Sequence, residues 1–341
     1  MSTGSIAAID LFCGIGGLSL GLQQSGVSVV GGIDNDPFCA PIYEANLNTS
    51  FIHADVRNVK LKQLEPLWGE SPHRLLAGCA PCQPFSSHRR GISTVKDDRW
   101  PLLREFGRLV RQSKPDFVTM ENVTRLQRSD IFHEFVEQLE KLKYHVAFDV
   151  LDLHKLGLPQ YRKRLVLVAS RLAPIELPSL ESEVTTVEDV LAQLPPVAAG
   201  QSLASDPMHH TQALTERNMQ RIKASTPGGT WRDWPADLRL PCHKRDSGKF
   251  YSSVYGRMTW DAPSPTLTTQ FFNYGTGRFG HPEQDRALTL REGAILQGFP
   301  PTFDFSGQTV SIANMGRVIG NAVPPLLGKK IGEIFLSQIK P

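Results

Sequence analysis

The chain lacks the features of a secreted or membrane protein. Its first residues, MSTGSIAAIDLFCG, carry no basic segment before the short apolar run, which is typical of a first β-strand and not of a signal peptide. No apolar stretch of the sequence approaches the length of a membrane span. The cysteines, at positions 13, 39, 79, 82 and 242, are odd in number. This argues against a disulfide framework and predicts free thiols in a reducing, cytoplasmic compartment.

A strong excess of charge is also missing. The 37 Lys and Arg residues nearly balance the 34 Asp and Glu residues, so the formal charge of +3 does not by itself identify nucleic acid as a partner. Internal repeats and low-complexity tracts are absent from the sequence. The 341 residues are enough for a large core and for two domains of unequal size.

Short apolar runs alternate with longer amphipathic ones between Ile6 and about Ser170. This pattern predicts a doubly wound, mostly parallel α/β sheet covered by helices on both faces. The predicted strands are 6–11, 27–34, 51–55, 74–80, 116–123, 145–153 and 164–170, and the predicted helices include 100–113 and 131–143.

The composition changes after about residue 171. Residues from about 172 to 256 are rich in Pro, Ser, Thr, Gly and His and have few periodic runs, whereas apolar helical runs return at 290–299 and 323–339. We therefore expect one domain from 1–171 and about 310–341. A smaller, loop-rich domain is expected from about 172 to 309, with its variable part at about 172–256.

The stretch DLFCGIGG indicates a ligand site where the first strand turns into a helix. Gly14, Gly16 and Gly17 allow a tight turn and a close approach to the backbone, but Ser19 stands where a dinucleotide-binding fingerprint would have its third glycine. Asp34 and Asp55 end the next two apolar runs, where carboxylates suit a ribose and an exocyclic amine. Together they favour an adenosine without phosphates, such as S-adenosylmethionine, although each feature alone also occurs as turn or cap chemistry.

The stretch GCAPCQPFS contains two cysteines with different expected roles. No second CxxC or His pair completes a zinc site, and the prolines argue against the helix start of a redox pair. Cys79 ends an apolar strand and is interpreted as a small buried apolar residue. Cys82 lies on a turn stiffened by Pro81 and Pro84, which is how a reactive thiol can be held at the mouth of a cleft.

Further polar residues lie at the same predicted edge of the sheet. Glu121, in the sequence ENV, ends the next strand, and ligands of open parallel sheets bind at the carboxyl ends of the strands. Arg162 and Arg164, in QYRKR, alternate as the chain enters another strand, so both are expected to face one side. Each could also be a cap or a surface ion pair.

The blocks DLFCGIGG, APCQPFS, ENV, QYRKR and GNAVPP, in this order, resemble those of the cytosine-C5 DNA methyltransferases. The resemblance covers nearly all of the chain except the middle lobe. It implies a Rossmann-like class I S-adenosylmethionine-dependent fold and a smaller target-recognition domain. It also implies cofactor contacts by Phe12, Asn321 and Val323. Because no zinc site is complete, no metal is expected.

The chemistry of C5 methylation gives the candidate residues distinct expected roles. Cys82 would add to C6 of cytosine and so activate C5, which is a weak carbon nucleophile. Glu121 would act near N3 and Arg162 near O2, where electron density builds up, and Arg164 would hold the loop or Glu121 in place. The cytosine must be flipped out of the duplex for this attack.

Double-stranded DNA is accordingly the expected partner. The polar, basic stretch after Cys82 is expected to close over the DNA, and the variable stretch to read its sequence. The predicted DNA contacts are Gln83, Ser86, Arg89, Arg90, Arg232, Lys244 and Arg245. A restriction or other defence system could supply protein partners, and a monomer is the default expectation.

Three other functions are compatible with parts of the pattern. A transfer RNA cytosine methyltransferase would share the catalytic residues. An inactive DNA-binding module would not need Cys82, Glu121 and Arg162, and a Rossmann dehydrogenase is disfavoured by the glycine spacing. The target sequence cannot be read from one chain.

Overall fold

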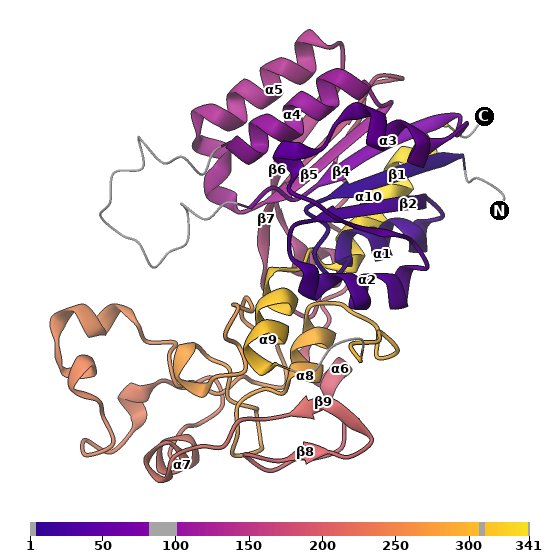
Figure 1. Cartoon of the computed structure of the whole chain (residues 1–341). Helices are drawn as coiled ribbons and strands as arrows, with labels where there is room; N and C mark the ends of the chain where they lie inside the picture. Colours follow the sequence, from indigo (N-terminus) through magenta and orange to yellow (C-terminus); the bar gives the residue numbers. More distant parts are fainter. Residues whose placement is uncertain (1–4, 82–100, 307–310, 340–341) are drawn as a thin grey trace. The chain divides into compact units, whose positions relative to one another are not determined.

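The computed structural model describes residues 5–81, 101–306 and 311–339, which form two compact units (Figure 1). The first unit comprises Met1–Leu156, Lys163–Glu181 and Ala322–Pro341, and the second comprises Gly157–Arg162 and Ser182–Asn321. The second unit thus includes a short piece, 157–162, that lies between two strands of the first. The expected boundaries were about 172 and 310. Among the described residues, no helix is long and apolar enough to cross a membrane.

A seven-stranded sheet in the order β3-β2-β1-β4-β5-β7-β6 forms the centre of the first unit. Each predicted strand is present, with bounds within two residues of those expected, and β7 alone runs antiparallel to its neighbours. The strands are β1 (Ile6–Leu11), β2 (Ser28–Asp34), β3 (Phe51–His53), β4 (His73–Gly78), β5 (Phe117–Asn122), β6 (His145–Asp152) and β7 (Lys163–Ser170). The sheet is the mostly parallel, doubly wound type that the alternation predicted.

Helices cover both faces of this sheet (Figure 1). Helices α3 (Leu61–Trp68), α4 (Pro101–Ser113) and α5 (Asp130–Lys141) pack on one face, and α1 (Gly17–Ser25), α2 (Ala40–Leu47) and α10 (Pro325–Ser337) belong to the other side. Side chains of β5 alternate between the two faces: Val118 and Met120 join the core beneath α4 and α5, while the ring of Phe117 lies 4.8 Å from that of Phe335 on α10. A strand in the middle of such a sheet carries apolar side chains on both faces, and Phe117, Val118 and Met120 provide them here.

Helices α1 and α10 cross at glycines. A Cβ added at Gly21 would lie 2.0 Å from the Pro325 carbonyl oxygen, and one added at Gly328 would lie 2.5 Å from the Leu18 carbonyl oxygen. The C-terminal helix therefore packs directly on the backbone of the helix that follows the glycine turn.

The strand directions bring three chain segments to one edge of the sheet. Strands β4 and β5 are parallel, and Gly78 pairs with Met120. Because β7 is antiparallel to β5, its first residues lie beside the last residues of β5, and Leu165 pairs with Asn122. The edge thus collects residues 78–81, the end of β5 and the start of β7.

The second unit has little regular secondary structure. Its elements are α6 (Val187–Leu191), β8 (Ser202–Leu203), β9 (Asp206–His210), α7 (Glu216–Lys223), α8 (Leu290–Leu296), α9 (Ile312–Asn321) and short 3-10 helices. Buried side chains replace strand pairing here. Arg257, which is 5% exposed, donates to the carbonyl oxygens of Ile222, Ser225, His281 and Gln284. Loop backbone that is removed from water needs such partners.

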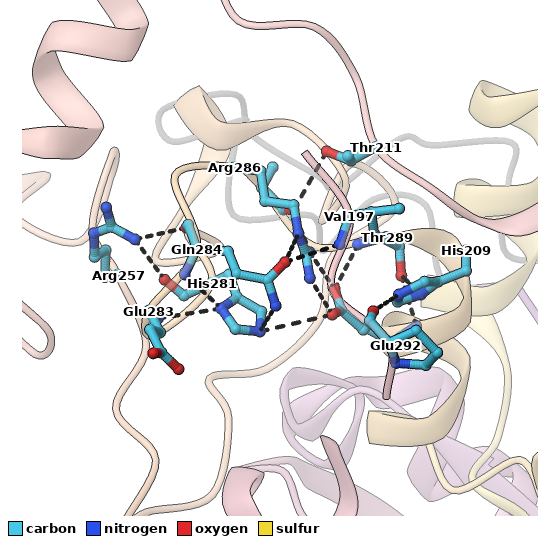
Figure 2. A network of polar contacts seen from close by, with 12 residues as sticks. Val197, His209, Thr211, Arg257, His281, Glu283, Gln284, Arg286, Thr289 and Glu292 are labelled. Atoms are coloured by element: carbon cyan, nitrogen blue, oxygen red, sulfur yellow. Dashed lines mark hydrogen bonds and ion pairs between the residues drawn. The ribbon is translucent and has the colours of Figure 1, made fainter. Parts of the chain in front are cut away.

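A buried ion pair anchors this framework (Figure 2). Arg286 donates two hydrogen bonds, both 2.7 Å, to the two carboxylate oxygens of Glu292, and both side chains are 1% exposed. Burial by itself raises the pKa of Glu292, but the hydrogen bonds and charge of Arg286 lower the pKa below its ordinary value. Thr289 donates its backbone N–H to Glu292 and contacts His209 through its hydroxyl (3.1 Å), so the ion pair reaches β9.

Candidate active site

The turn between β1 and α1 is held in a left-handed conformation. Phe12, Gly14 and Gly16 have φ values of 58°, 53° and 87°, and helix α1 begins at Gly17. A Cβ at Gly16 would lie 2.5 Å from Leu47 Cδ1, so only glycine fits between the turn and α2. Nothing lies within 4 Å of a Cβ built at Gly14. The turn is therefore tightly packed on one side and open at Gly14.

Two predicted cofactor carboxylates have different surroundings. Asp34 ends β2, and its two oxygens accept hydrogen bonds from the N–H groups of Gly14 and Asp36, both 2.9 Å. Burial raises the pKa of Asp34, and these backbone hydrogen bonds oppose the rise. Asp55 lies beyond the end of β3 and pairs with Arg57, whose hydrogen bonds lower the pKa of Asp55. Each carboxylate oxygen has further lone pairs for a ligand.

A third carboxylate lies beneath the turn. Asp10, 1% exposed, accepts a hydrogen bond from the Ser19 hydroxyl on Oδ2 (2.7 Å), while its Oδ1 is buried and has no hydrogen-bond partner among the described residues. Burial raises the pKa of Asp10 to about 7, and the charge of Asp34 adds to the rise. Asp10 and Asp34, two acidic groups next to the open glycine turn, suit a ligand that carries a positive charge and no phosphate. S-adenosylmethionine, with its sulfonium, is such a ligand.

Glu121 lies at the end of β5 with both carboxylate oxygens engaged. The Cys79 thiol donates to Oε2 (2.9 Å), and Arg164 Nε lies 2.8 Å from Oε1. The Glu121 side chain is only 5% exposed. The acid is therefore fixed between the residues after β4 and the first residues of β7, at the sheet edge where these segments meet.

Cys79 does not have the role that the sequence predicted for it. The residue as a whole is partly exposed, but its thiol is buried and donates a hydrogen bond to Glu121, so it is not enclosed by apolar groups alone. Burial of the thiol raises the pKa of Cys79 well above its ordinary value, and the charge of Glu121 raises it further. A thiol in this state is a poor nucleophile at neutral pH, because the thiolate is the reactive form.

Asn122 ties the segment after Cys79 to β5. Its side-chain amide donates to the Ala80 carbonyl oxygen (2.8 Å), and its side-chain oxygen accepts the Val123 N–H (2.9 Å). These bonds fix the chain two residues before Cys82. Cys82 itself and the predicted DNA contacts Gln83, Ser86, Arg89 and Arg90 lie outside the described residues.

Arg162 and Arg164 belong to different units, although they alternate in the sequence. Arg162 is 1% exposed, and within the second unit its guanidinium donates to the side-chain oxygen of Gln160 (3.3 Å) and to the carbonyl oxygens of Leu267 (3.4 Å) and Gly320 (3.2 Å). Arg164 lies in the first unit and pairs with Glu121. The chain passes from one unit to the other at Lys163. The two arginines therefore do not face the same side of a single unit, as their alternation had predicted.

The remaining predicted residues are dispersed. Asn321 is the exposed last residue of α9 in the second unit, whereas Val323 is buried in the first unit just before α10. Helix α10 begins with Pro325 at its first position, where the missing N–H of proline leaves no helical hydrogen bond unmade. Arg232, Lys244 and Arg245 are exposed in the second unit.

Comparison with known proteins decides the family. Residues 6–336 match the family model of the C-5 cytosine-specific DNA methylases. The type II methylase M.HgiDII of Herpetosiphon aurantiacus is 45% identical over 334 residues, covering 96% of this chain and 94% of the relative. The type II methyltransferase M1.HphI of Haemophilus parahaemolyticus is 33% identical, covering 98% and 87%. The chain belongs to the C-5 cytosine-specific DNA methylase family. It is a DNA (cytosine-5-)-methyltransferase.

Solved structures agree with the fold of this methyltransferase. A putative DNA modification methyltransferase encoded within an E. coli prophage has a TM-score of 0.74 at 21% identity and covers 98% of this chain and 99% of its own. The S. pombe Dnmt2 methyltransferase has a TM-score of 0.63 at 18% identity, with the same coverage. At these identities the likeness concerns the fold alone.

Two residues near the candidate site, and one contact within it, were missed by sequence analysis. Asp10 is the residue before the last in β1, and an acidic residue inside an apolar run was the available signal. Asn122 is the residue after Glu121 within the ENV block. For the contact between Cys79 and Glu121 the sequence offers no signal, because it arises from the pairing of β4 with β5.

Proposed function

We propose that the methyltransferase modifies C5 of a flipped-out cytosine in a specific double-stranded DNA sequence, through a transient bond between the Cys82 sulfur and C6. The observation that carries this proposal is the position of Glu121. It lies at the carboxyl end of β5, next to the segment that leads into Cys82, with Arg164 on one carboxylate oxygen and Cys79 on the other. An acid, a cation and a nearby thiol are what addition to a pyrimidine ring requires.

Cys82, and not Cys79, supplies the nucleophile in this proposal. The Cys79 thiol is engaged by Glu121, and its raised pKa keeps it protonated. Cys82 follows three residues later, on a segment anchored through Ala80 by Asn122. Addition of its thiolate to C6 moves electron density toward N3 and O2 and makes C5 enamine-like.

Glu121 and Arg164 would stabilise the charge that develops on the ring. Glu121 shares a proton with N3, and the guanidinium next to it offsets negative charge at O2. Sequence analysis assigned this second role to Arg162. The acceptors that surround Arg162 in the second unit favour a framework role for it, and the 2.8 Å contact with Glu121 favours Arg164 near the ring.

S-adenosylmethionine, the cofactor of the family, supplies an activated methyl group when bound. We infer that Phe12, Gly14, Gly16, Gly17, Asp34 and Asp55 contact it, with Asn321 and Val323 as further contacts. Asp10 adds a carboxylate whose second oxygen is buried without a partner in the described structure, an arrangement that suits a positively charged ligand.

The second unit would read the DNA sequence, and the residues after Cys82 would close over the duplex. Arg232, Lys244 and Arg245 are the candidate contacts in the second unit, and Gln83, Ser86, Arg89 and Arg90 are those outside the described residues. Because relatives bear the names of type II methyltransferases, we further propose a role in restriction-modification, with a cognate nuclease acting on the same sequence.

A duplex containing 5-fluorocytosine tests the mechanism. Fluorine at C5 cannot leave as a proton does, so the enzyme should be trapped as a covalent adduct after methyl transfer. The target sequence would come from methylation-sensitive sequencing of DNA from cells that express the protein. Peptide mapping should place the adduct on Cys82, and Cys82→Ser should form none. An adduct on Cys79, or methyl transfer to total transfer RNA in preference to duplex DNA, would refute the proposal.

A further inference from the structure

Two adjacent aromatic side chains of the second unit are exposed. Phe250 is 81% exposed and Tyr251 is 53% exposed, at the end of the 3-10 helix η8 (Asp246–Phe250). The other exposed large apolar side chains in the described part of the chain are separate in the sequence. Adjacent exposed aromatics mark binding surfaces more often than isolated ones do.

A small aromatic core holds the backbone of this pair. Trp231 donates its indole N–H to the Tyr251 carbonyl oxygen (3.0 Å), and its ring stacks on His243 at 4.2 Å. Trp231 also packs with Trp234 and Leu238. Both tryptophans are nearly fully buried, so the exposed pair is attached to a packed aromatic core. A preorganised support of this kind lowers the entropy cost of binding.

Positively charged residues lie close to the pair in the sequence and next to its aromatic core. Between Arg239 and Tyr251 the sequence has four Lys and Arg residues and one Asp. Lys244 and Arg245 are exposed, and the exposed Arg232 lies with its guanidinium carbon 5.5 Å from the Trp231 ring centroid. The surface therefore combines an apolar centre with cations. Phosphate groups attract such cations, and thymine methyl groups in the major groove provide apolar area.

We propose that Phe250 and Tyr251 contact the bases of the target duplex, while Arg232, Lys244 and Arg245 contact its phosphates. The inference rests on the proposed function, because it requires DNA as the substrate. The aromatic pair then discriminates between sequences, and the cations contribute affinity that does not depend on sequence.

A second copy of the chain is the rival occupant of this surface. A two-fold interface would use this same surface on both copies, so two surfaces that each carry Arg232, Lys244 and Arg245 would be brought together. Like charges that meet in this way oppose association, whereas the DNA backbone attracts them. Charge complementarity thus favours DNA.

Binding of the full chain to a fluorescent target duplex and to a scrambled duplex tests the assignment. Anisotropy would be measured over a range of salt concentrations with S-adenosylhomocysteine present. Phe250→Ala should weaken binding to the target about tenfold, as expected for one lost base contact, with little change for the scrambled duplex. Lys244→Ala should weaken both duplexes and make the salt dependence less steep by about one counterion.

Val184→Ala is the matched control, since Val184 is an exposed apolar residue (55%) of the same unit but lies outside this surface. Equal binding by Phe250→Ala and Val184→Ala would overturn the inference. So would an equal loss on both duplexes, or a change in oligomeric state with DNA binding intact. Failure of the proposed function would be seen earlier, as absence of duplex methylation by the unaltered protein.

Discussion

Replacing Asp10 by Asn should change how the stability of the first unit depends on pH. The pKa of Asp10 is raised from 3.8 to about 7, chiefly by burial. Between these values the unfolded chain has released the proton that the folded chain still holds. The free energy of unfolding therefore falls as pH rises through this window and levels off above about 7.

The size of the effect follows from the shift. About three pKa units at 1.36 kcal/mol each correspond to about 4 kcal/mol over the whole window, and about 3 kcal/mol of this lies between pH 5 and 8. An asparagine side chain cannot titrate, so the variant should lack this loss. The free energy of unfolding of Asp10→Asn, taken relative to that of the unaltered protein, should therefore rise by about 3 kcal/mol between pH 5 and pH 8.

Hydrogen exchange of peptides from β1 and β4, measured without cofactor at several pH values, reports on the first unit separately from the second. Ser19→Ala is the control, because it removes the hydrogen bond to Asp10 Oδ2 but leaves the carboxyl group. In Ser19→Ala the free energy of unfolding should still fall as the pH rises, and the fall should continue to higher pH. If the free energy of unfolding of Asp10→Asn fell with pH as steeply as that of the unaltered protein, Asp10 would not titrate in this window.

Four further substitutions test the site and the framework. Glu121→Gln should lower turnover by about 100-fold or more with little change in DNA affinity, and equal losses of both would contradict its role at the ring. Arg164→Ala should mainly lower turnover, because it removes the cation proposed to act at the cytosine ring. Arg162→Met should mainly destabilise the second unit, by about 3 kcal/mol in urea unfolding. The reverse result would indicate that Arg162, and not Arg164, contacts the ring. Arg286→Met leaves the buried carboxylate of Glu292 unpaired and should lower the free energy of unfolding by about 3–5 kcal/mol. The double variant with Glu292→Leu should recover part of this loss. If it recovered none, the unpaired carboxylate would not be the cause.

The strands and the motif blocks could be predicted because their signals are local. An apolar run bounded by turn residues specifies a strand wherever it packs, and β1 has the predicted bounds of Ile6–Leu11. The glycine turn is equally local, since left-handed φ values at Gly14 and Gly16 are a property of the residue type. The strand pattern predicted the fold class, and the resemblance of the motif blocks predicted the family, before any contact was known.

The second unit could not be predicted in this way. Its residues from 182 to about 256 have few periodic runs, and buried side chains such as that of Arg257 satisfy backbone groups of this unit. Arg257 binds four carbonyl oxygens from segments up to 35 residues away in sequence, and no local pattern marks it as different from a surface arginine.

The sequence by itself determined the α/β sheet, the order of the motif blocks and the candidate residues Cys82 and Glu121, since each depends on residue type and near neighbours. Only the tertiary structure decided which groups contact Glu121. That outcome depends on β7 running antiparallel beside β5, which brings Arg164 to the acid, and on the chain entering the first unit only after Arg162. Strand order and direction are set by packing across the whole sheet, and alternation along one strand does not encode them.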